Sequence, residues 1–206
     1  MRLLNLGCGS VRPPDPWINV DTILAVHVAM PERDAAPVRA QLAREPNYVE
    51  HDISCLPWPW EDGSLDGILA SHILEHFDCL TSLALVRECR RVLAPGGVLR
   101  VSVPDAAYFR AVHAEDNAAN AERLFGQPLY GGQTMLDYAF FFIGHRQTFC
   151  EDSLWCLLVN GGFTPDSIHR EEPGYTRSNA EVAWLLAKHD NRLQMSLFYE
   201  AWKSGE

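Results

Sequence analysis

A glycine-rich turn between two apolar runs constrains the fold of this chain more than any other feature. Residues 4–21 read LNLGCGSVRPPDPWINVD, so Gly7 and Gly9 follow the first run and Asp21 ends the second. Glycines after a strand let the backbone approach a ligand closely, because they carry no Cβ. Three prolines stand where a nucleotide-binding helix would begin, and proline removes helix donors and clashes with the preceding turn. The stretch therefore predicts a ligand-binding loop without the usual helix.

The same stretch disfavours a diphosphate ligand. The dinucleotide fingerprint GxGxxG needs a third glycine where this chain has Arg12, and an acid about 20 residues on. Asp21 follows Gly7 by only 14 positions (21 minus 7). A pyrophosphate also needs the N-terminus of a helix that opens at the loop. An oxidoreductase built on a dinucleotide is thus the least favoured function.

Apolar, β-branched runs alternate with helical patterns along the chain, which predicts a parallel sheet with helices on both faces. The predicted strands are 2–6, 17–21, 48–53, 65–71 and 98–103, followed later by 167–171 and 195–200. Helices are predicted over 79–93 and 151–160, whereas 180–188 fits a helix or a strand. A length of 206 residues suits one domain.

Residues 105–148 break this alternation. A helix is predicted over about 106–124, and an aromatic cluster follows it near residues 138–142. Because the segment follows a strand end, we expect a helical cap inserted above the ligand crevice. The alternative is a peripheral helical subdomain that only shields the edge of the sheet.

Two aspartates at predicted strand ends narrow the ligand further. Ligands of open parallel sheets bind beyond the carboxyl ends of the strands. The carboxylate of Asp21 is suited to accept hydrogen bonds from a ribose diol, and Asp52 to accept one from the amine of adenine. A lone aspartate more often caps a turn. Two of them beside a glycine loop favour adenosine without phosphates.

Several segments resemble, in order and spacing, the class I S-adenosylmethionine-dependent methyltransferases. They are LNLGCGS, WINVD, HDISCLPWPWEDGSLDGILASHILEHF, RRVLAPGGVLRVSVPD and HRQTFCEDSLWCLLVNGGF, which cover most of residues 1–104 and 145–163. The resemblance is to a type 11-like branch of this family with a short first connection. It implies an α/β fold with a doubly wound, mostly parallel, seven-stranded Rossmann-like sheet and an antiparallel last strand. One methyltransferase domain would span residues 1–206, with the cap at 105–148 inside it.

The resemblance also implies which residues bind S-adenosylmethionine. The loop would lie under the methionine part and the ribose, Asp21 would hold the ribose hydroxyls, and Asp52 with Ile53 the adenine. Ser71, His72 and His76 would sit near the sulfonium. The loop residues are Asn5, Leu6, Gly7, Cys8, Gly9 and Ser10. Asn5 stands where an acid is usual and Val11 where a third glycine is common, although Asn5 still offers an acceptor oxygen.

Methyl transfer depends above all on in-line placement of the acceptor, and a hydroxyl acceptor adds the need for a general base. His72 and His145 are the candidate bases, although a single histidine is more often structural. Asp105, Tyr130 and Arg146 are the candidates for binding the acceptor. The favoured function is O-methylation of a small polar molecule, such as a sugar or natural product. The alternative, motivated by Asn5 and Val11, is a catalytically silent binding module or regulatory partner.

Composition and charge limit the partners. The formal charge of −10 argues against nucleic acid, which requires clustered Lys and Arg. No apolar run is long enough for a membrane span, and the chain starts directly in a strand pattern without a signal peptide, so we expect a cytoplasmic protein. Six scattered cysteines fit reduced thiols. No metal site is predicted: His72 and His76 are four residues apart, but no third ligand is evident. The oligomeric state stays unassigned.

Overall fold

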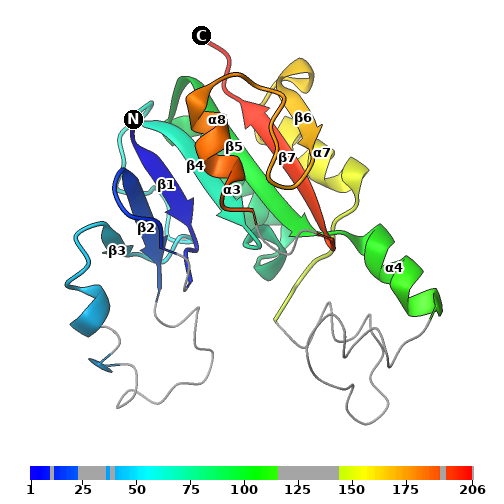
Figure 1. The fold of residues 1–206 in the computed structure, drawn as a ribbon, viewed down its shortest axis with the longest axis horizontal. Helices are drawn as coiled ribbons and strands as arrows, with labels where there is room; N and C mark the ends of the chain where they lie inside the picture. The colour runs from blue at the N-terminus through cyan, green and yellow to red at the C-terminus, as the bar shows by residue number, and fades with distance from the viewer. Residues whose placement is uncertain (10–11, 23–35, 38–39, 116–143, 191–193, 206) are drawn as a thin grey trace.

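The fold is a seven-stranded sheet with helices on both faces (Figure 1). The computed structural model describes residues 1–9, 12–22, 36–37, 40–115, 144–190 and 194–205. The strand order is β3-β2-β1-β4-β5-β7-β6. The strands are β1 (Leu3–Leu6), β2 (Trp17–Asp21), β3 (Tyr48–Glu50), β4 (Leu65–Ser71), β5 (Leu93–Pro104), β6 (Ile168–Glu171) and β7 (Ser196–Trp202). The predicted Rossmann-like fold is confirmed.

Parallel pairing joins β3, β2, β1, β4 and β5, whereas β7 runs antiparallel to both β5 and β6. In the centre, Leu6 pairs with Val20 on one side and with Ala70 on the other. Strand order reverses between β1 and β4, so their carboxyl ends form the crevice in which open sheets bind ligands. The antiparallel last strand expected from the family resemblance is confirmed.

The third strand is shorter than the predicted range 48–53. The chain leaves the strand after Glu50 because a turn forms around Asp52. Its carboxylate accepts the backbone N–H of Ser54 at 2.9 Å, and its carbonyl accepts the N–H of Cys55 at 2.9 Å. An aspartate that folds back on the next amides favours a turn over a strand.

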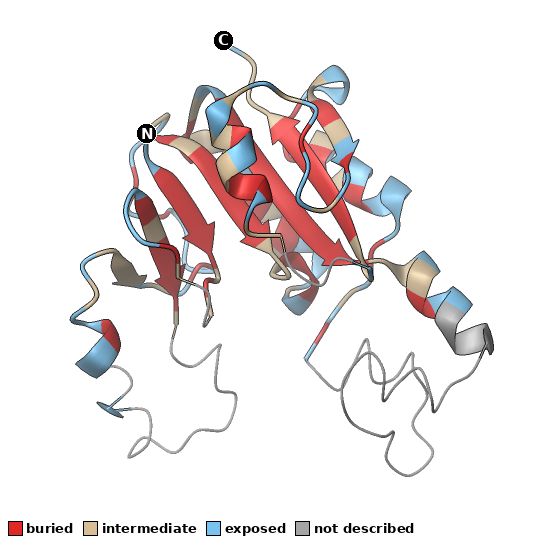
Figure 2. Ribbon diagram, in the orientation of Figure 1, coloured by how far each residue is buried: buried red, intermediate tan, exposed pale blue. Residues whose placement is uncertain are grey.

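Helices cover the two faces of the sheet with separate apolar clusters. They are α3 (Cys79–Val92), α4 (Ala106–Glu115), α7 (Glu151–Asn160) and α8 (Glu181–Ala187), with 3-10 turns η1 (Leu74–His76) and η3 (Pro165–Ser167). Buried residues of α3 and α7 share a core with Leu4 and Leu6, whereas α8 packs with Leu3 on the opposite face. Figure 2 shows the central strands β1, β4, β5 and β7 mostly buried between these layers. The predicted helices 79–93 and 151–160 are confirmed. The segment 180–188, for which the sequence fits either a helix or a strand, forms the helix α8.

Side-chain amides hold the short connection between β1 and β2. Asn19 and Asn47 each donate a hydrogen bond of 2.8 Å to the carbonyl of Pro13, and Arg12 donates one of 2.7 Å to the carbonyl of Gly9. Residues 12–16 contain no helix, as the prolines predict. Fixed contacts thus replace the missing helix in returning the chain to β2.

The predicted cap lies mostly outside the described residues. Its first helix is present as α4, which begins directly after β5 (Figure 1). The aromatic cluster near residues 138–142, Ser10 and Tyr130 all fall outside the described ranges. The single domain with an inserted cap stays a prediction. Within the described part of the chain, no helix is long and apolar enough to cross a membrane.

Candidate functional site

The glycine loop ends β1 at the carboxyl edge of the sheet. Gly7 and Gly9 have φ angles of 64° and 51°, a left-handed backbone that suits glycine far better than other residues. Between them, the N–H of Cys8 donates a hydrogen bond of 3.0 Å to the carbonyl of Val20 on the next strand. The alternation of conformations turns the backbone sharply and fixes it against β2.

Asp21 lies buried beside this loop, with 7% of its surface exposed. Its carboxylate accepts the N–H of Gly9 at 2.8 Å with one oxygen and the N–H of Thr22 at 2.7 Å with the other. Burial raises the pKa of Asp21 above its ordinary value, while these two amide hydrogen bonds act in the opposite direction. Each carboxylate oxygen has further lone pairs, so it can still accept a hydroxyl from a ligand.

Gly7 and Gly9 differ in how closely other side chains approach them. A Cβ placed on Gly9 would meet no heavy atom of the described residues within 4 Å, so none of those residues covers the loop there. A Cβ on Gly7 would lie 1.8 Å from Cδ1 of Ile73, so this side chain covers Gly7. A ligand can thus approach Gly9 and Asp21 directly, whereas access to Gly7 requires Ile73 to rotate.

Three loop side chains point away from the open side. Leu6 and Cys8 are buried, and burial raises the pKa of the Cys8 thiol to about 12. Asn5, expected to offer an acceptor oxygen to a ligand, donates its amide to Asn19 at 3.1 Å. Through Asn19, which donates to Pro13, Asn5 supports the proline connection. These residues shape the loop through the backbone and the core.

Asp52 and Ile53 lie after β3, next along the carboxyl edge. The carboxylate of Asp52 is exposed and accepts both the N–H and the hydroxyl of Ser54, which lowers its pKa. Ile53 is buried, and its carbonyl accepts the indole N–H of Trp58 at 2.8 Å. Asp52 has the turn-forming role of many lone aspartates, and an adenine contact stays a prediction.

His72, directly after β4, lies between a carboxylate and a hydroxyl group. Its φ of 55° is the left-handed conformation that non-glycine residues rarely adopt. Nδ1 lies 3.1 Å from Oε1 of Glu75, and Nε2 lies 2.9 Å from the hydroxyl of Ser196 at the start of β7. Beside it, the Ser71 and Ser102 hydroxyls are 3.0 Å apart across β4 and β5.

His145 reaches the same carboxylate from a distant part of the sequence. Its Nε2 lies 3.9 Å from Oε1 of Glu75, and its ring packs edge-on against His76 with centroids 4.8 Å apart. The predicted residues His72, His76 and His145 therefore meet around one side chain that the sequence analysis missed. The signal for Glu75 was present: it lies three residues after His72, the spacing of neighbouring side chains on a helical turn.

Asp105 and Arg146, which are predicted to bind the methyl acceptor, are less tightly grouped than the three histidines. Asp105 lies directly before α4, and its carboxylate accepts the N–H of Ala107 at 2.8 Å. Arg146 is exposed, and its backbone N–H donates to the carbonyl of Glu75 at 2.7 Å. Asp105 is joined by a strand-like bridge to Phe149, so it contacts the segment 144–149 in which Arg146 lies. Acceptor binding by either side chain stays a prediction.

A cavity of about 360 Å³ lies at the other end of the sheet, where β4 and β5 begin. It is lined by Met1, Asp66, Pro95, Gly96, Gly97, Glu181 and Val182, and it contains none of the candidate residues. Because open parallel sheets bind ligands at the carboxyl ends of their strands, the carboxyl edge remains the candidate site.

Comparison with known proteins shows which domain this part of the chain resembles. Residues 4–101 match the family model described as a methyltransferase domain. That match runs from β1 through most of β5 and so includes the glycine loop, Asp21 and the His72 region. The matched part of the chain is a methyltransferase domain of the S-adenosylmethionine-dependent family. No curated protein matches the sequence of this methyltransferase significantly.

Solved structures share the fold of this methyltransferase. An S-adenosylmethionine-dependent methyltransferase from Thermotoga maritima superposes with a TM-score of 0.57 at 16% identity, covering 98% of this chain and 82% of the other. One from Archaeoglobus fulgidus gives 0.53 at 16% identity, covering 98% and 86%. One from Mesorhizobium loti gives 0.51 at 19% identity, covering 98% and 90%. At these identities the likeness establishes the fold, and the family's cofactor is S-adenosylmethionine.

Proposed function

We propose that this methyltransferase transfers a methyl group to a hydroxyl of a small polar acceptor, such as a sugar or a natural product. The observation that carries the proposal is the convergence of His72 and His145 on the buried carboxylate of Glu75. An imidazole next to a carboxylate is well placed to take a hydroxyl proton, because the resulting cation is compensated. The formal charge of −10 favours a small acceptor over a nucleic acid.

The cofactor would lie along the carboxyl edge from Asp52 to His72. Asp21 and the open space above Gly9 suit the ribose, since a buried carboxylate accepts two hydroxyls in a charge-assisted way. The backbone of residues 6–10 would support the methionine part once Ile73 has rotated away from Gly7. The cofactor supplies an electrophilic methyl group when bound. The sulfonium end would then face Ser71, His72 and His76, close to the candidate bases.

Labelled methyl transfer tests this function. Full-length protein is incubated with S-adenosylmethionine that carries a labelled methyl group and with matched sugars, phenols, amines and thiols. We expect label on hydroxyl acceptors. Exclusive labelling of amines or thiols would contradict O-methylation, and no transfer to any acceptor would favour the silent binding module.

The two candidate bases are distinguished by substitution. We expect the imidazole that takes the proton to contribute about 10²- to 10⁴-fold to kcat, the usual range for a general base. His72→Gln and His145→Gln should be compared for kcat and for affinity toward S-adenosylhomocysteine. A base shows a fall in kcat with unchanged product affinity. Substitution of a residue that only maintains the fold changes both kcat and the affinity for S-adenosylhomocysteine, or changes neither.

Cofactor affinity is expected to fall as the pH is lowered. Because burial raises the pKa of Asp21, the folded protein takes up this proton at a higher pH than the unfolded chain does. The neutral carboxyl is a weaker acceptor for the ribose hydroxyls, so the Kd for S-adenosylhomocysteine should rise as the pH approaches that pKa. Calorimetry over a pH series measures this. Asp21→Asn should bind more weakly and lack this step, and an unchanged step in that variant would refute the assignment.

A further inference from the structure

Donor atoms of Glu75, His76 and His145 all lie within 4.8 Å of one another. Glu75 and His76 belong to η1, directly after β4, and His145 comes from the segment that precedes α7. That segment is fastened to η1 by its backbone: the N–H groups of Arg146 and Gln147 donate to the carbonyl of Glu75 at 2.7 and 3.3 Å. The approach of His145 to Glu75 is thus built into the fold.

Side-chain hydrogen bonds also hold segment 144–149 in place. The side-chain amide of Gln147 donates to the carbonyl of Leu74 at 3.0 Å and to the hydroxyl of Ser82 at 2.6 Å. The Ser82 hydroxyl in turn donates to the same Leu74 carbonyl at 2.9 Å. Because these groups are buried or half-buried, the arrangement positions His145 rigidly, as a binding site requires.

Glu75 points to a cation. Its side chain is 1% exposed, and neither of its buried carboxylate oxygens has a hydrogen-bond partner among the described residues. Two basic groups lie close to Oε1 of this carboxylate, Nδ1 of His72 at 3.1 Å and Nε2 of His145 at 3.9 Å. Buried polar groups are nearly always hydrogen-bonded, and a buried carboxylate needs a compensating charge. The position therefore calls for a positive ligand.

We propose that Glu75, His76 and His145 bind a divalent transition-metal ion. One carboxylate and two imidazoles form a ligand set that Zn²⁺ accepts in catalytic sites, with coordination positions left for a water or substrate. With metal–ligand bonds of about 2.0–2.2 Å, two donor atoms on a tetrahedral ion lie about 3.3–3.6 Å apart. The donor atoms observed within 4.8 Å of one another therefore have to close by up to about 1.4 Å when the ion binds. His76 is the exposed member of the three, which leaves room for this movement.

His72 would position the carboxylate instead of completing the set. It lies between Glu75 and Ser196, and carboxylates that bind metals are commonly oriented by such outer contacts. With His145 on the ion, His72 remains as the imidazole for the acceptor's proton. An ion at this edge would bind the acceptor oxygen and favour loss of its proton. Metal binding itself requires neither acceptor nor cofactor, so its failure is separable from failure of the proposed function.

Cobalt titration of the chelator-treated full-length protein tests the site. Co²⁺ is a suitable probe because thiolate ligands give an intense charge-transfer band, and Cys55, Cys79, Cys150 and Cys156 are exposed. We expect one equivalent to bind without that band. His76→Ala should weaken binding at least 100-fold, because a ligand is lost from a three-residue set. This substitution is at an exposed position, so the fold should be retained.

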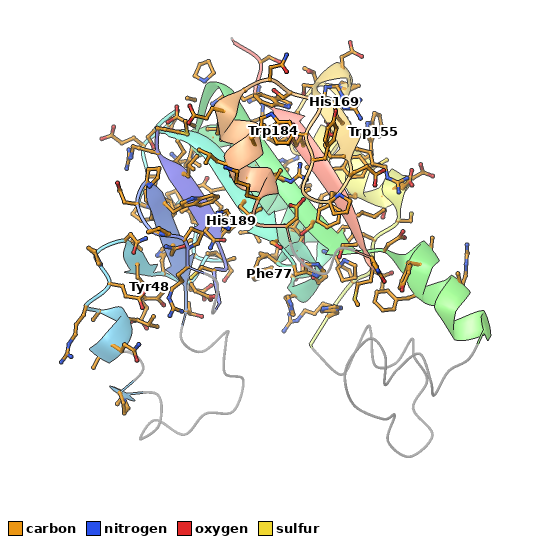
Figure 3. All side chains as sticks on the ribbon, in the orientation of Figure 1. Tyr48, Phe77, Trp155, His169, Trp184 and His189 are labelled. Carbon is orange, nitrogen blue, oxygen red and sulfur yellow. The ribbon has the colours of Figure 1, made fainter. Side chains whose placement is uncertain are left out.

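His169→Ala is the matched control. His169 is half-buried on β6, and Figure 3 shows it at the opposite end of the sheet from Phe77, the residue after His76. Its loss should leave Co²⁺ binding unchanged. Absence of saturable binding in the wild type, or equal affinity in His76→Ala, would overturn the proposal. A thiolate band would assign the ion to cysteines and overturn it equally.

Glu75→Gln gives an independent readout at nearly constant size. A ligand that binds only the folded state raises Tm by mass action, so Co²⁺ should raise the Tm of the wild type. The same concentration should leave the Tm of Glu75→Gln unchanged. An equal rise in both proteins would show that Glu75 is no ligand and would contradict the site.

Discussion

Replacing Asp21 by alanine is expected to weaken binding of S-adenosylhomocysteine by roughly 100-fold or more, since each hydrogen bond to a charged group contributes about 1.5–3 kcal/mol. Two such bonds to the ribose hydroxyls would be lost together. The substitution also removes the acceptor for the N–H groups of Gly9 and Thr22, so the loop loses its support from β2. Calorimetric titration with S-adenosylhomocysteine measures the change.

Glu50→Gln is the control for this experiment. Glu50 pairs with Asp21 in the register of β2 and β3, and it too ends a strand at the carboxyl edge. It is exposed, unlike Asp21, and removing its charge should leave the Kd within a factor of about 2, the size of an ordinary surface effect. Asp21→Asn separates loss of charge from loss of volume. Wild-type affinity in Asp21→Ala, or an equal loss in Glu50→Gln, would refute the ribose-binding role.

Local sequence patterns were sufficient for most of the fold. The apolar runs 17–21 and 65–71 have the same bounds as β2 and β4, because continuous burial on both faces of the sheet leaves a clear apolar signal in the sequence. The helix predicted over 79–93 begins where Asp78 caps it, with its carboxylate accepting the N–H of Thr81 at 2.8 Å. The length of the edge strand β3 was overestimated, with a predicted range of 48–53. The turn formed by Asp52 ends the strand early, and edge strands show only weak periodicity in their sequences.

The candidate site was only partly accessible from sequence. Asp21 and the glycine loop are local features of one connection, so their meeting follows from strand order. The approach of His145 to Glu75 joins residues 70 positions apart (145 minus 75), and no periodicity reports on it. Glu75 also resembles an ordinary acid on a helical turn until its burial is known. The cluster of Glu75, His76 and His145 forms because segment 144–149 packs against η1, and only the structure shows this long-range contact.

Replacing Arg100 by methionine is expected to lower the free energy of unfolding by about 3–5 kcal/mol. Its partners, like those of Glu75, are distant in the sequence and cannot be predicted from a local pattern. The side chain is fully buried in β5, and the sequence VLRVSV gives no sign of its partners. Its guanidinium pairs with Asp190 at 2.5 Å and with Glu200 on β7 at 2.8 Å. Removing the cation leaves two buried carboxylates uncompensated, which is more costly than the loss of the contacts themselves.

These pairs also connect α8 to the sheet, because Asp190 follows α8 and accepts the N–H of Gly174 at 2.7 Å. Urea unfolding with linear extrapolation measures the loss in Arg100→Met. Arg170→Met is the control: Arg170 pairs with Glu151, but both side chains are 51% exposed, so the expected cost is no more than about 1 kcal/mol. A cost for Arg100→Met no larger than for Arg170→Met would contradict the buried network.

The pH dependence of Arg100→Met distinguishes uncompensated charge from a packing defect. Burial raises the pKa of Glu200 even beside the arginine, and without that cation the carboxyl should hold its proton at a still higher pH. A raised pKa means that the folded state binds the proton more tightly than the unfolded state, so stability is gained as the pH falls through it. The stability gap between Arg100→Met and wild type should therefore narrow on acidification. A gap of constant size would assign the loss to packing, because a cavity has no proton to take up.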